Sequence, residues 1–118
     1  MEKELLKSDK DFLLKDLSGR LPYGVKVKTN NINILKLGTH TRVGEYVTDV
    51  IEPCKPYLFP LSSMTTKQKA ELSMLVVGVE DIFKSFLIEV EFYNKHHIDY
   101  RGLIPMGLAI DCTNLNIY

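Results

Sequence analysis

The spacing of apolar positions near the N-terminus predicts a helix. These positions follow a helical period at Phe12, Leu13, Leu17 and Leu21. Ser8 is a candidate N-cap, with Asp11 three residues later in the place of a capping-box acid. Gly19 is a candidate for the residue that ends this helix, and Pro22 prevents its continuation.

From Tyr23 onward the period changes from helical spacing to alternation. Val25 and Val27 alternate with lysines, which predicts a half-buried strand, and Thr29 to Asn31 predicts a turn. The alternation continues through Ile32 and Ile34, after which Leu35 and Leu37 fall out of phase, so we expect a bulge or burial on both faces. We also expect a loop over residues 38–44 and a third strand over residues 46–51.

Prolines then surround a short aromatic run, Tyr57-Leu58-Phe59. Because proline has no N–H to donate to a sheet ladder, we expect Pro56 and Pro60 to lie on an edge strand or an extended surface crossing. The aromatic run itself fits either a lid over the core or an exposed strip that binds a partner.

The second half of the chain predicts two helices. Thr65 and Gln68 have capping-box spacing ahead of the first, and Gly78 is a candidate break between the two. The strongest helical pattern follows, and we expect one buried stripe at Ile82, Phe86, Val90 and Tyr93. A strand over residues 86–90 is the alternative interpretation, because that segment contains β-branched residues.

The last segment contains several glycines and Pro105, so long elements end there. Its apolar residues Leu103, Ile104, Leu108 and Ile110 are frequent enough that we expect the tail to dock on the core. Together the patterns predict one α+β domain over residues 1–118. We expect a small antiparallel sheet of three to five strands, open or closed into a barrel, with an N-terminal helix and two helices in the C-terminal half.

Composition places few limits on function. The chain has 118 residues with 15 basic and 15 acidic side chains, so strong steering toward nucleic acid or membrane is not expected. The longest apolar run is too short to span a bilayer and the charged start does not resemble a signal peptide, so a cytoplasmic protein is expected. Cys54 and Cys112 have no metal or redox spacing, and free thiols are the better interpretation.

Charge is distributed unevenly along this neutral chain. No acid lies between Asp16 and Glu45, while acids dominate between Glu80 and Glu91. The basic segment suggests a surface that follows a phosphate backbone, with a tyrosine ring for stacking. The candidate binding residues are Arg20, Tyr23, Lys26, Lys28, Lys36 and Arg42. The alternative is a sheet edge that lysine protects from pairing.

Three blocks of the sequence resemble a known family. They are Arg20-Leu21-Pro22-Tyr23-Gly24-Val25-Lys26, the run from Lys55 to Thr65 (KPYLFPLSSMT), and the run from His96 to Ile104 (HHIDYRGLI). The blocks are similar to those of small uncharacterised proteins of gut Bacteroidales genomes and of their phages and mobile elements. The resemblance covers most of the chain beyond Phe12 and implies a mobile-element context. It implies no catalytic residue.

One further cluster brings titratable and aromatic groups together. Its members are His96, His97, Asp99, Tyr100 and Arg101. Adjacent histidines on a helix point in different directions, so we expect no shared metal ion and no cofactor. We expect His97 to pack at a helix end, where the partial negative charge of the helix terminus favours a protonated ring.

Two functional hypotheses follow from these observations. The first is a non-catalytic accessory or interaction protein of a phage or mobile element that binds protein or nucleic acid. The alternative is a small hydrolase or metal-dependent enzyme centred on His96, His97 and Asp99. A deep pocket around those side chains would favour the enzyme, whereas an exposed binding face would favour the interaction protein.

Overall fold

The N-terminal helix is longer than its capping signals predict. In the computed structural model, which describes residues 7–29, 32–38 and 54–118, α1 spans Lys7–Arg20. It continues through Gly19 and passes into a short 3-10 turn, Leu21–Tyr23. Gly24 then ends the helical segment with a φ of 68°, a left-handed conformation that glycine adopts without strain. The predicted stop at Gly19 is therefore wrong, and Gly24 takes that role.

The described strands form an open, mixed sheet with the order β2-β1-β3-β4, and β5 also pairs with β3. The strands are β1 (Lys26–Lys28), β2 (Leu35–Lys36), β3 (Lys55–Pro60), β4 (Ile98–Asp99) and β5 (Ile110–Asp111). β1 pairs antiparallel with β2 and β3, whereas β4 and β5 run parallel to β3. The α+β class is confirmed, and of the two forms expected for the sheet the described strands show the open one. The expected antiparallel pairing holds for β1 with β2 and β3, whereas β4 and β5 pair parallel to β3.

The proline-rich strand is the centre of this sheet, so the predicted edge position is wrong. Proline has no N–H to donate, but the hydrogen bonds from β3 to β4 and β5 use backbone groups of Phe59 and Leu58. The Phe59 N–H donates to the His97 carbonyl over 2.8 Å, and the Leu58 carbonyl accepts from the Cys112 N–H over 2.9 Å. Tyr57 and Leu58 are buried, so this run belongs to the core and not to a partner-binding strip.

Residues 30–31 of the expected turn lie outside the described residues, and beside them the Thr29 N–H donates to the Ile32 carbonyl. Ile32 and Ile34 are exposed, however, and the inward residues of this segment are Leu35 and Leu37. The expected continuation of the first alternation is therefore wrong. The third strand expected at residues 46–51, and the expected loop from residue 39 on, lie outside the described residues.

One hydrophobic core joins α1, the sheet and the C-terminal tail. Its most deeply buried members are Leu13, Leu17, Val25, Val27, Leu37, Leu58, Leu103 and Leu108. The predicted docking of the tail is confirmed, since Leu103 and Leu108 belong to this cluster. Tyr118 extends the docking: its hydroxyl accepts from the Lys26 N–H and donates to the Tyr57 carbonyl, each over 2.8 Å. The phenol thereby bridges β1 and β3 where their direct pairing ends.

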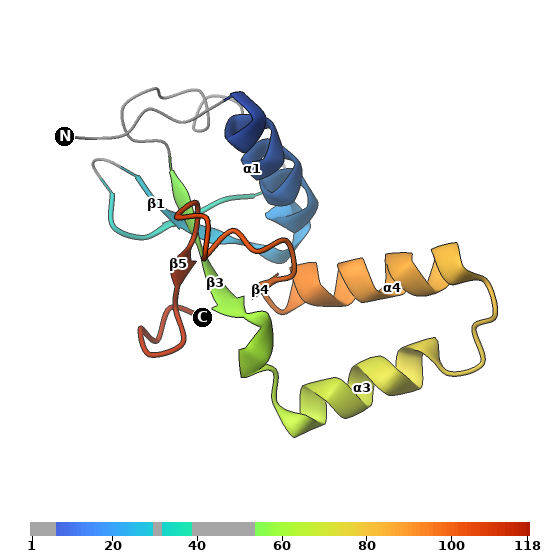
Figure 1. The fold of residues 1–118 in the computed structure, drawn as a ribbon. Helices are drawn as coiled ribbons and strands as arrows, with labels where there is room; N and C mark the ends of the chain where they lie inside the picture. The colour runs from blue at the N-terminus through green and yellow to red at the C-terminus, as the bar shows by residue number, and fades with distance from the viewer. Residues whose placement is uncertain (1–6, 30–31, 39–53) are drawn as a thin grey trace.

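Two helices project from this body as a hairpin (Figure 1). α3 (Thr66–Val76) carries the predicted capping box of Thr65 and Gln68, and α4 (Ile82–Lys95) begins at the N-cap Asp81. α3 has no buried residue, and the buried residues of α4 are Phe92 and Asn94 near its end. Both helices are confirmed, including α4 against the alternative of a strand. The predicted buried stripe is wrong, because Ile82 and Phe86 are exposed to solvent.

The contrast between core and hairpin predicts two different mutational costs. Leu103→Ala should lower the free energy of unfolding by about 2–5 kcal/mol, because it removes a fully buried side chain from the core. Phe86→Ala should cost less than about 1 kcal/mol, as a surface substitution does. Urea unfolding followed by circular dichroism measures both. A larger cost for Phe86→Ala than for Leu103→Ala would contradict the packing described above.

Candidate functional site

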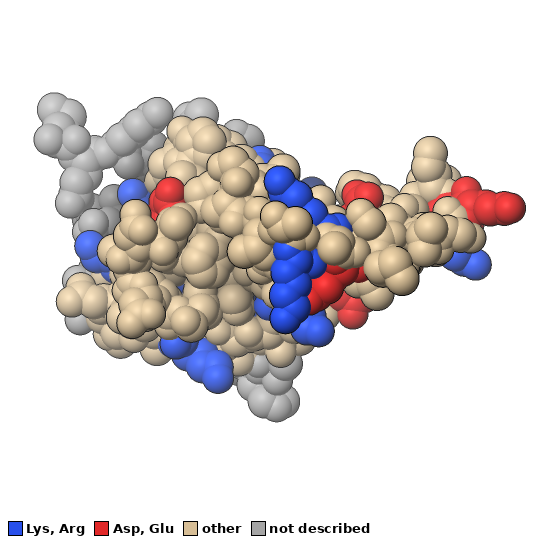
Figure 2. All heavy atoms as spheres, turned by 90° about the horizontal axis from the view of Figure 1, so that it is seen from below, with Lys and Arg blue, Asp and Glu red and all other residues tan. Residues whose placement is uncertain are grey.

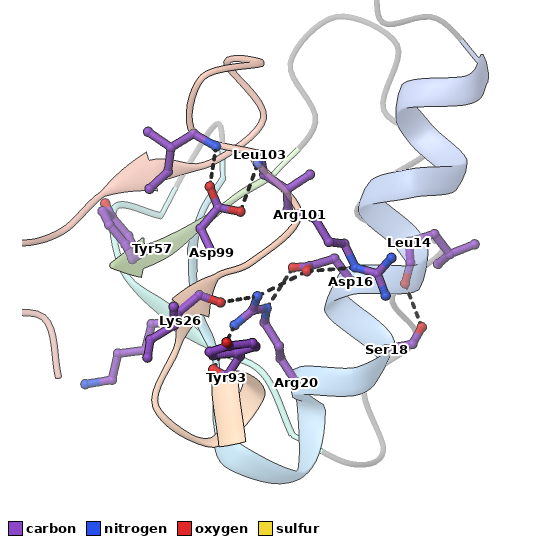
Figure 3. Close-up of polar contacts among 12 residues, drawn as sticks. Leu14, Asp16, Ser18, Arg20, Lys26, Tyr57, Tyr93, Asp99, Arg101 and Leu103 are labelled. Carbon is purple, nitrogen blue, oxygen red and sulfur yellow. Dashed lines mark hydrogen bonds and ion pairs between the residues drawn. The ribbon is translucent and has the colours of Figure 1, made fainter. Parts of the chain in front are cut away.

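A buried ion pair occupies the junction of α1, α4 and β4. Arg20 donates to both carboxylate oxygens of Asp16, over 2.8 and 3.1 Å, and both side chains are fully buried (Figure 3). The same guanidinium donates to the Ile98 carbonyl over 2.7 Å and lies 3.5 Å from the Tyr93 carbonyl. Arg20 is therefore a structural residue. Its place in the expected phosphate-binding surface is corrected, because burial removes its charge from the surface.

A second arginine completes the neutralisation of Asp16. Arg101 Nε lies 3.3 Å from Asp16 Oδ1, in ionic contact but without hydrogen-bond geometry. The Arg101 guanidinium also lies 5.0 Å from the centre of the Tyr100 ring and 5.6 Å from that of Phe12. Arg101 of the expected cluster thus contacts Asp16, and Tyr100 lies beside the guanidinium groups of both arginines.

One face of the β1/β2 pair carries Lys26, Lys28 and Lys36, but two members of the basic set are engaged in other contacts. Lys26 donates to the Ile117 carbonyl over 2.8 Å, and Tyr23 donates to Glu91 over 3.1 Å. Lys28 and Lys36 are exposed, and Lys36 lies opposite Lys26 in the β1/β2 register. Arg42 lies outside the described residues. Among the described cations of this set, only Lys28 and Lys36 are thus free to meet a phosphate.

The histidines and Asp99 take separate roles. The His96 ring packs on Phe92 at a centroid distance of 4.4 Å, whereas the His97 ring stacks on Tyr118 at 3.6 Å. The Asp99 carboxylate is buried and accepts from the backbone N–H groups of Leu103 and Ile104 (Figure 3). Within the described part of the chain, no group of three potential metal-ligating side chains comes together.

His97 follows α4 with a φ of 58°, a left-handed conformation that is uncommon outside glycine. Burial lowers the pKa of this histidine to about 4, and the nearby charges of Arg20, His96 and Lys26 act in the same direction. The ring is therefore neutral at physiological pH. The expected protonated ring at a helix end is wrong, because α4 ends at Lys95 and desolvation acts more strongly than the helix terminus.

Neither cysteine is prepared for nucleophilic chemistry. Both are free and buried. Burial raises the pKa of the Cys54 thiol to about 12 and that of the Cys112 thiol to about 11. Because the thiolate is the reactive form, both thiols are inert at neutral pH.

The largest departure from an ordinary surface is on α4. Four apolar residues there form what is called here the α4 stripe, and their exposed fractions are 78% for Ile82, 78% for Phe83, 60% for Phe86 and 64% for Leu87. Spacings of three and four residues put these side chains on one face of the helix. Val90 continues the same face, half-buried, toward the body. A contiguous exposed apolar face of this size is unusual on a soluble monomer.

A groove lies between the two helices of the hairpin, with a cavity volume of about 710 Å³. Met74 and Leu75 from α3 and Ile88 and Phe92 from α4 supply its apolar wall. The charged lining is balanced in sign and consists of Lys67, Glu71, Glu91 and Lys95. The groove and the α4 stripe use different faces of α4, so the hairpin is apolar on two sides.

The hairpin carries both signs of charge along its length. Acidic side chains reach its far tip with a basic one near them, and both signs lie side by side where the hairpin meets the body (Figure 2). Glu80 and Asp81 precede α4 at the tip, and Lys95 ends it at the base. Lys67 lies in the first turn of α3, also near the base.

Among the described residues, no helix combines the length and apolar character that crossing a membrane requires. In comparisons with known proteins, no family model, no curated protein and no solved structure matches this chain.

The sequence predicts the apolar periodicity of α4, but the expectation that this face lies in the core is wrong. The signal that could have shown this is the segment from Val77 to Asp81, which separates α3 and α4 and lets them form a hairpin. Sequence reasoning also missed the Asp16–Arg20 pair. The signal for it was the position of both residues at helical spacing on the side of α1 that carries Leu13 and Leu17.

The buried Asp16–Arg20 pair predicts a large loss of stability when Arg20 alone is replaced, and a smaller loss when both residues are replaced. Arg20→Met should lower the free energy of unfolding by about 3–5 kcal/mol, because it leaves Asp16 buried without its main partner. The double variant Asp16→Leu/Arg20→Met should recover part of that loss. Chemical unfolding of both, with the exposed Lys15→Met as control, measures the difference. A double variant that is less stable than Arg20→Met would contradict this account.

The lowered pKa of His97 predicts a loss of stability in mild acid. Between pH 6.5 and about 4 the unfolded chain takes up a proton at this ring and the folded chain does not, so stability falls as the pH drops through that window. The pH dependence of unfolding should be shallower in His97→Asn, because this variant lacks the titrating ring. Asparagine is chosen because it tolerates the left-handed backbone. His96→Asn is the control. Equal slopes for His97→Asn and the wild type would rule out this source of acid sensitivity.

Proposed function

We propose that this chain is a non-catalytic interaction protein that binds another protein through the α4 stripe. The observation that carries the proposal is the exposure of two phenylalanines, an isoleucine and a leucine on one helical face. With side-chain areas of about 150–250 Å² for aromatic residues, the stripe exposes roughly 600 Å², at the upper end for the largest patch of a monomer. Aromatic residues in such a patch are the type that dominates binding energy in protein interfaces.

The hairpin is also ordered in advance of binding, which lowers the entropic cost of association. Thr65 and Gln68 cap α3 reciprocally, and Asp81 accepts from the N–H groups of Phe83 and Lys84 at the start of α4. At its other end α4 is held by contacts of Phe92 and Asn94. A capped helix with an apolar face is a common docking element for another helix.

Nucleic acid is a weaker candidate for the partner. Binding to a phosphate backbone needs several free cations on one surface. Of the candidate cations in the described part of the chain, Arg20 is buried in its ion pair and Lys26 is engaged with the Ile117 carbonyl, which leaves Lys28 and Lys36. The formal net charge of zero gives no general attraction to compensate.

The separation of the candidate catalytic groups speaks against the alternative of a hydrolase. A histidine or carboxylate that acts as a general base needs to lie within hydrogen-bond reach of the proton that it takes up, with its lone pair free. The His97 ring stacks on Tyr118, and the Asp99 carboxylate accepts hydrogen bonds from two backbone N–H groups. The proposed role is therefore binding, and the resemblance to Bacteroidales phage and mobile-element proteins makes an accessory task in the cytoplasm part of the proposal.

Site-specific photo-crosslinking in cells tests the proposal. A benzophenone amino acid at position 83 should give covalent adducts with protein, because Phe83 lies in the middle of the exposed face. The same amino acid at position 32 is the control, since Ile32 is exposed but lies on the β1–β2 connection. Mass spectrometry identifies each adduct. Absence of adducts at position 83, or equal adducts at both positions, would sink the proposal.

A further inference from the structure

We infer that the sheet face opposite the core binds the phosphate backbone of a nucleic acid. This face is called here the lysine face, and its basic members are Lys26, Lys28, Lys36 and Lys55. The inference goes beyond the proposed function and does not depend on it, because the α4 stripe lies on a different element. Three observations carry it: the register that gathers the lysines, the lack of acids beside them on the described strands, and the inner position of most of them in the sheet.

The register of the sheet brings lysines from three strands together. Residues opposite each other on paired strands share a face, and so do residues two apart on one strand. Lys26 pairs with Lys36 across β1 and β2, and Lys28 pairs with Lys55 across β1 and β3. Because neighbouring strands lie about 4.8 Å apart and alternate residues of one strand about 6.6 Å apart, the four side chains leave one small area of the face.

The alternate positions of the same strands face the core, so the lysines face away from it. Val27 lies between Lys26 and Lys28 and is fully buried, and its partners in the two ladders are Leu35 and Pro56. The members of the lysine face other than Lys26 are exposed.

Lys55 changes the number of free cations on this face. It lies outside the basic segment that the sequence singles out, and it raises the number from two, Lys28 and Lys36, to three. Lys26 donates to the Ile117 carbonyl over 2.8 Å. That bond to a neutral group leaves the charge of the ammonium in place, so Lys26 adds to the positive potential over the face without a contact of its own.

No acid of the described strands shares the lysine face. The acids on these strands are Asp99 and Asp111, and they pair with Pro60 and Leu58, which alternate with the lysine-face positions of β3. The ion pairs among the described residues involve Asp16 in the body, so none of them neutralises a lysine of the face. Like charges directly opposite each other destabilise a sheet, and an external anion relieves that repulsion.

Protection of a sheet edge does not account for these lysines. Lysine often protects an exposed edge strand from pairing with another chain. In the described order β2-β1-β3-β4, β2 is at the edge and carries Lys36. The other three lysines are on β1 and β3, which have a neighbouring strand on each side. A binding surface explains like charges on inner strands, whereas edge protection does not.

The chemistry of the face fits phosphates better than a protein partner. None of the large apolar side chains exposed among the described residues lies on β1, β2 or β3, so the apolar anchors of a protein interface are missing there. A nucleic acid presents a charge about every 3.4 Å along each strand, so several phosphates can meet lysines that lie this close together.

The described aromatic rings of this face do not offer stacking to a base. Tyr57 is buried with its hydroxyl donating to the Asn33 carbonyl over 2.6 Å, and the Phe59 ring contacts that of Tyr118 at a centroid distance of 6.0 Å. Contacts to phosphate alone carry no sequence information. Binding is therefore independent of sequence and sensitive to salt, and the zero net charge of the chain limits its affinity.

Fluorescence anisotropy of the full chain with a labelled single strand and a labelled duplex, each of about 20 nucleotides, tests the inference. The wild type should bind with a Kd of about 10–100 µM at about 50 mM salt, and log K for the duplex should fall with log salt at a slope of about −3, as three phosphate contacts require.

Paired charge removal locates the contact. Lys28→Gln/Lys55→Gln should weaken binding by about 10-fold or more and reduce the salt slope by about 2. Lys67→Gln/Lys69→Gln makes the same change of net charge at exposed positions of α3 and should leave affinity and slope unchanged.

Urea unfolding separates loss of the face from loss of the fold. Lys28→Glu places an acid opposite Lys55, so it should raise the urea midpoint while it weakens binding. A midpoint below that of the wild type would contradict the placement of these two side chains side by side on one face.

The remaining outcomes decide between partners. A wild type that binds neither oligonucleotide at about 20 mM salt overturns the inference, and so does an equal loss of binding in the α3 control. Polyglutamate of similar length bound as tightly as the oligonucleotides would identify an acidic protein segment as the partner and overturn the nucleic acid. Binding of either oligonucleotide alone supports the inference, and the tighter one identifies the form recognised. None of these results changes the crosslinking expected at position 83, which tests the proposed function separately.

Discussion

The arrangement of this protein depends on the burial of the Arg20 guanidinium at the end of α1. Arg20 holds the Asp16 carboxylate on its own helix, the Ile98 carbonyl at β4 and the Tyr93 carbonyl near the end of α4. Burying an arginine is costly unless its charge is neutralised and its donors are used. Here the requirement is met by partners from three elements, so those elements can meet only where the guanidinium lies. The residue thereby fixes where α4 leaves the body.

This clamp explains why the hairpin projects. α4 is held at its C-terminal end, where Asn94 packs so closely on Gly19 that an added Cβ would lie 3.0 Å from the amide nitrogen. Toward its N-terminus the same helix has α3 as its neighbour among the described elements, with the groove between them. The side chains of the α4 stripe therefore lie beyond the reach of the core, although their spacing is that of core residues. An anchored base with an exposed apolar face is what recognition by a preformed helix requires.

Local signals predicted much of the fold. The capping box of Thr65 and Gln68 and the buried face of α1 are properties of short windows, and the structure has both. Prediction from the sequence failed where burial depends on which element packs against a face or pairs with a strand. Periodicity identified the apolar face of α4 but could not tell whether the covering partner is this chain or another. In the same way, the prolines of β3 predicted an edge, because the sequence does not reveal that its neighbours bond through Leu58 and Phe59.

The candidate binding and catalytic residues failed for a related reason. Arg20, His97 and Asp99 were singled out as ionisable groups, and each of them is used up in holding the body together. The basic charge of Arg20 neutralises Asp16, the neutral ring of His97 supports Tyr118, and Asp99 fixes the turn that brings Leu103 into the core. Arg20 and Asp99 find their polar partners within the body, whereas the large apolar side chains most exposed to water among the described residues lie on the hairpin. That contrast is the physical basis for proposing α4 as the place where a partner docks.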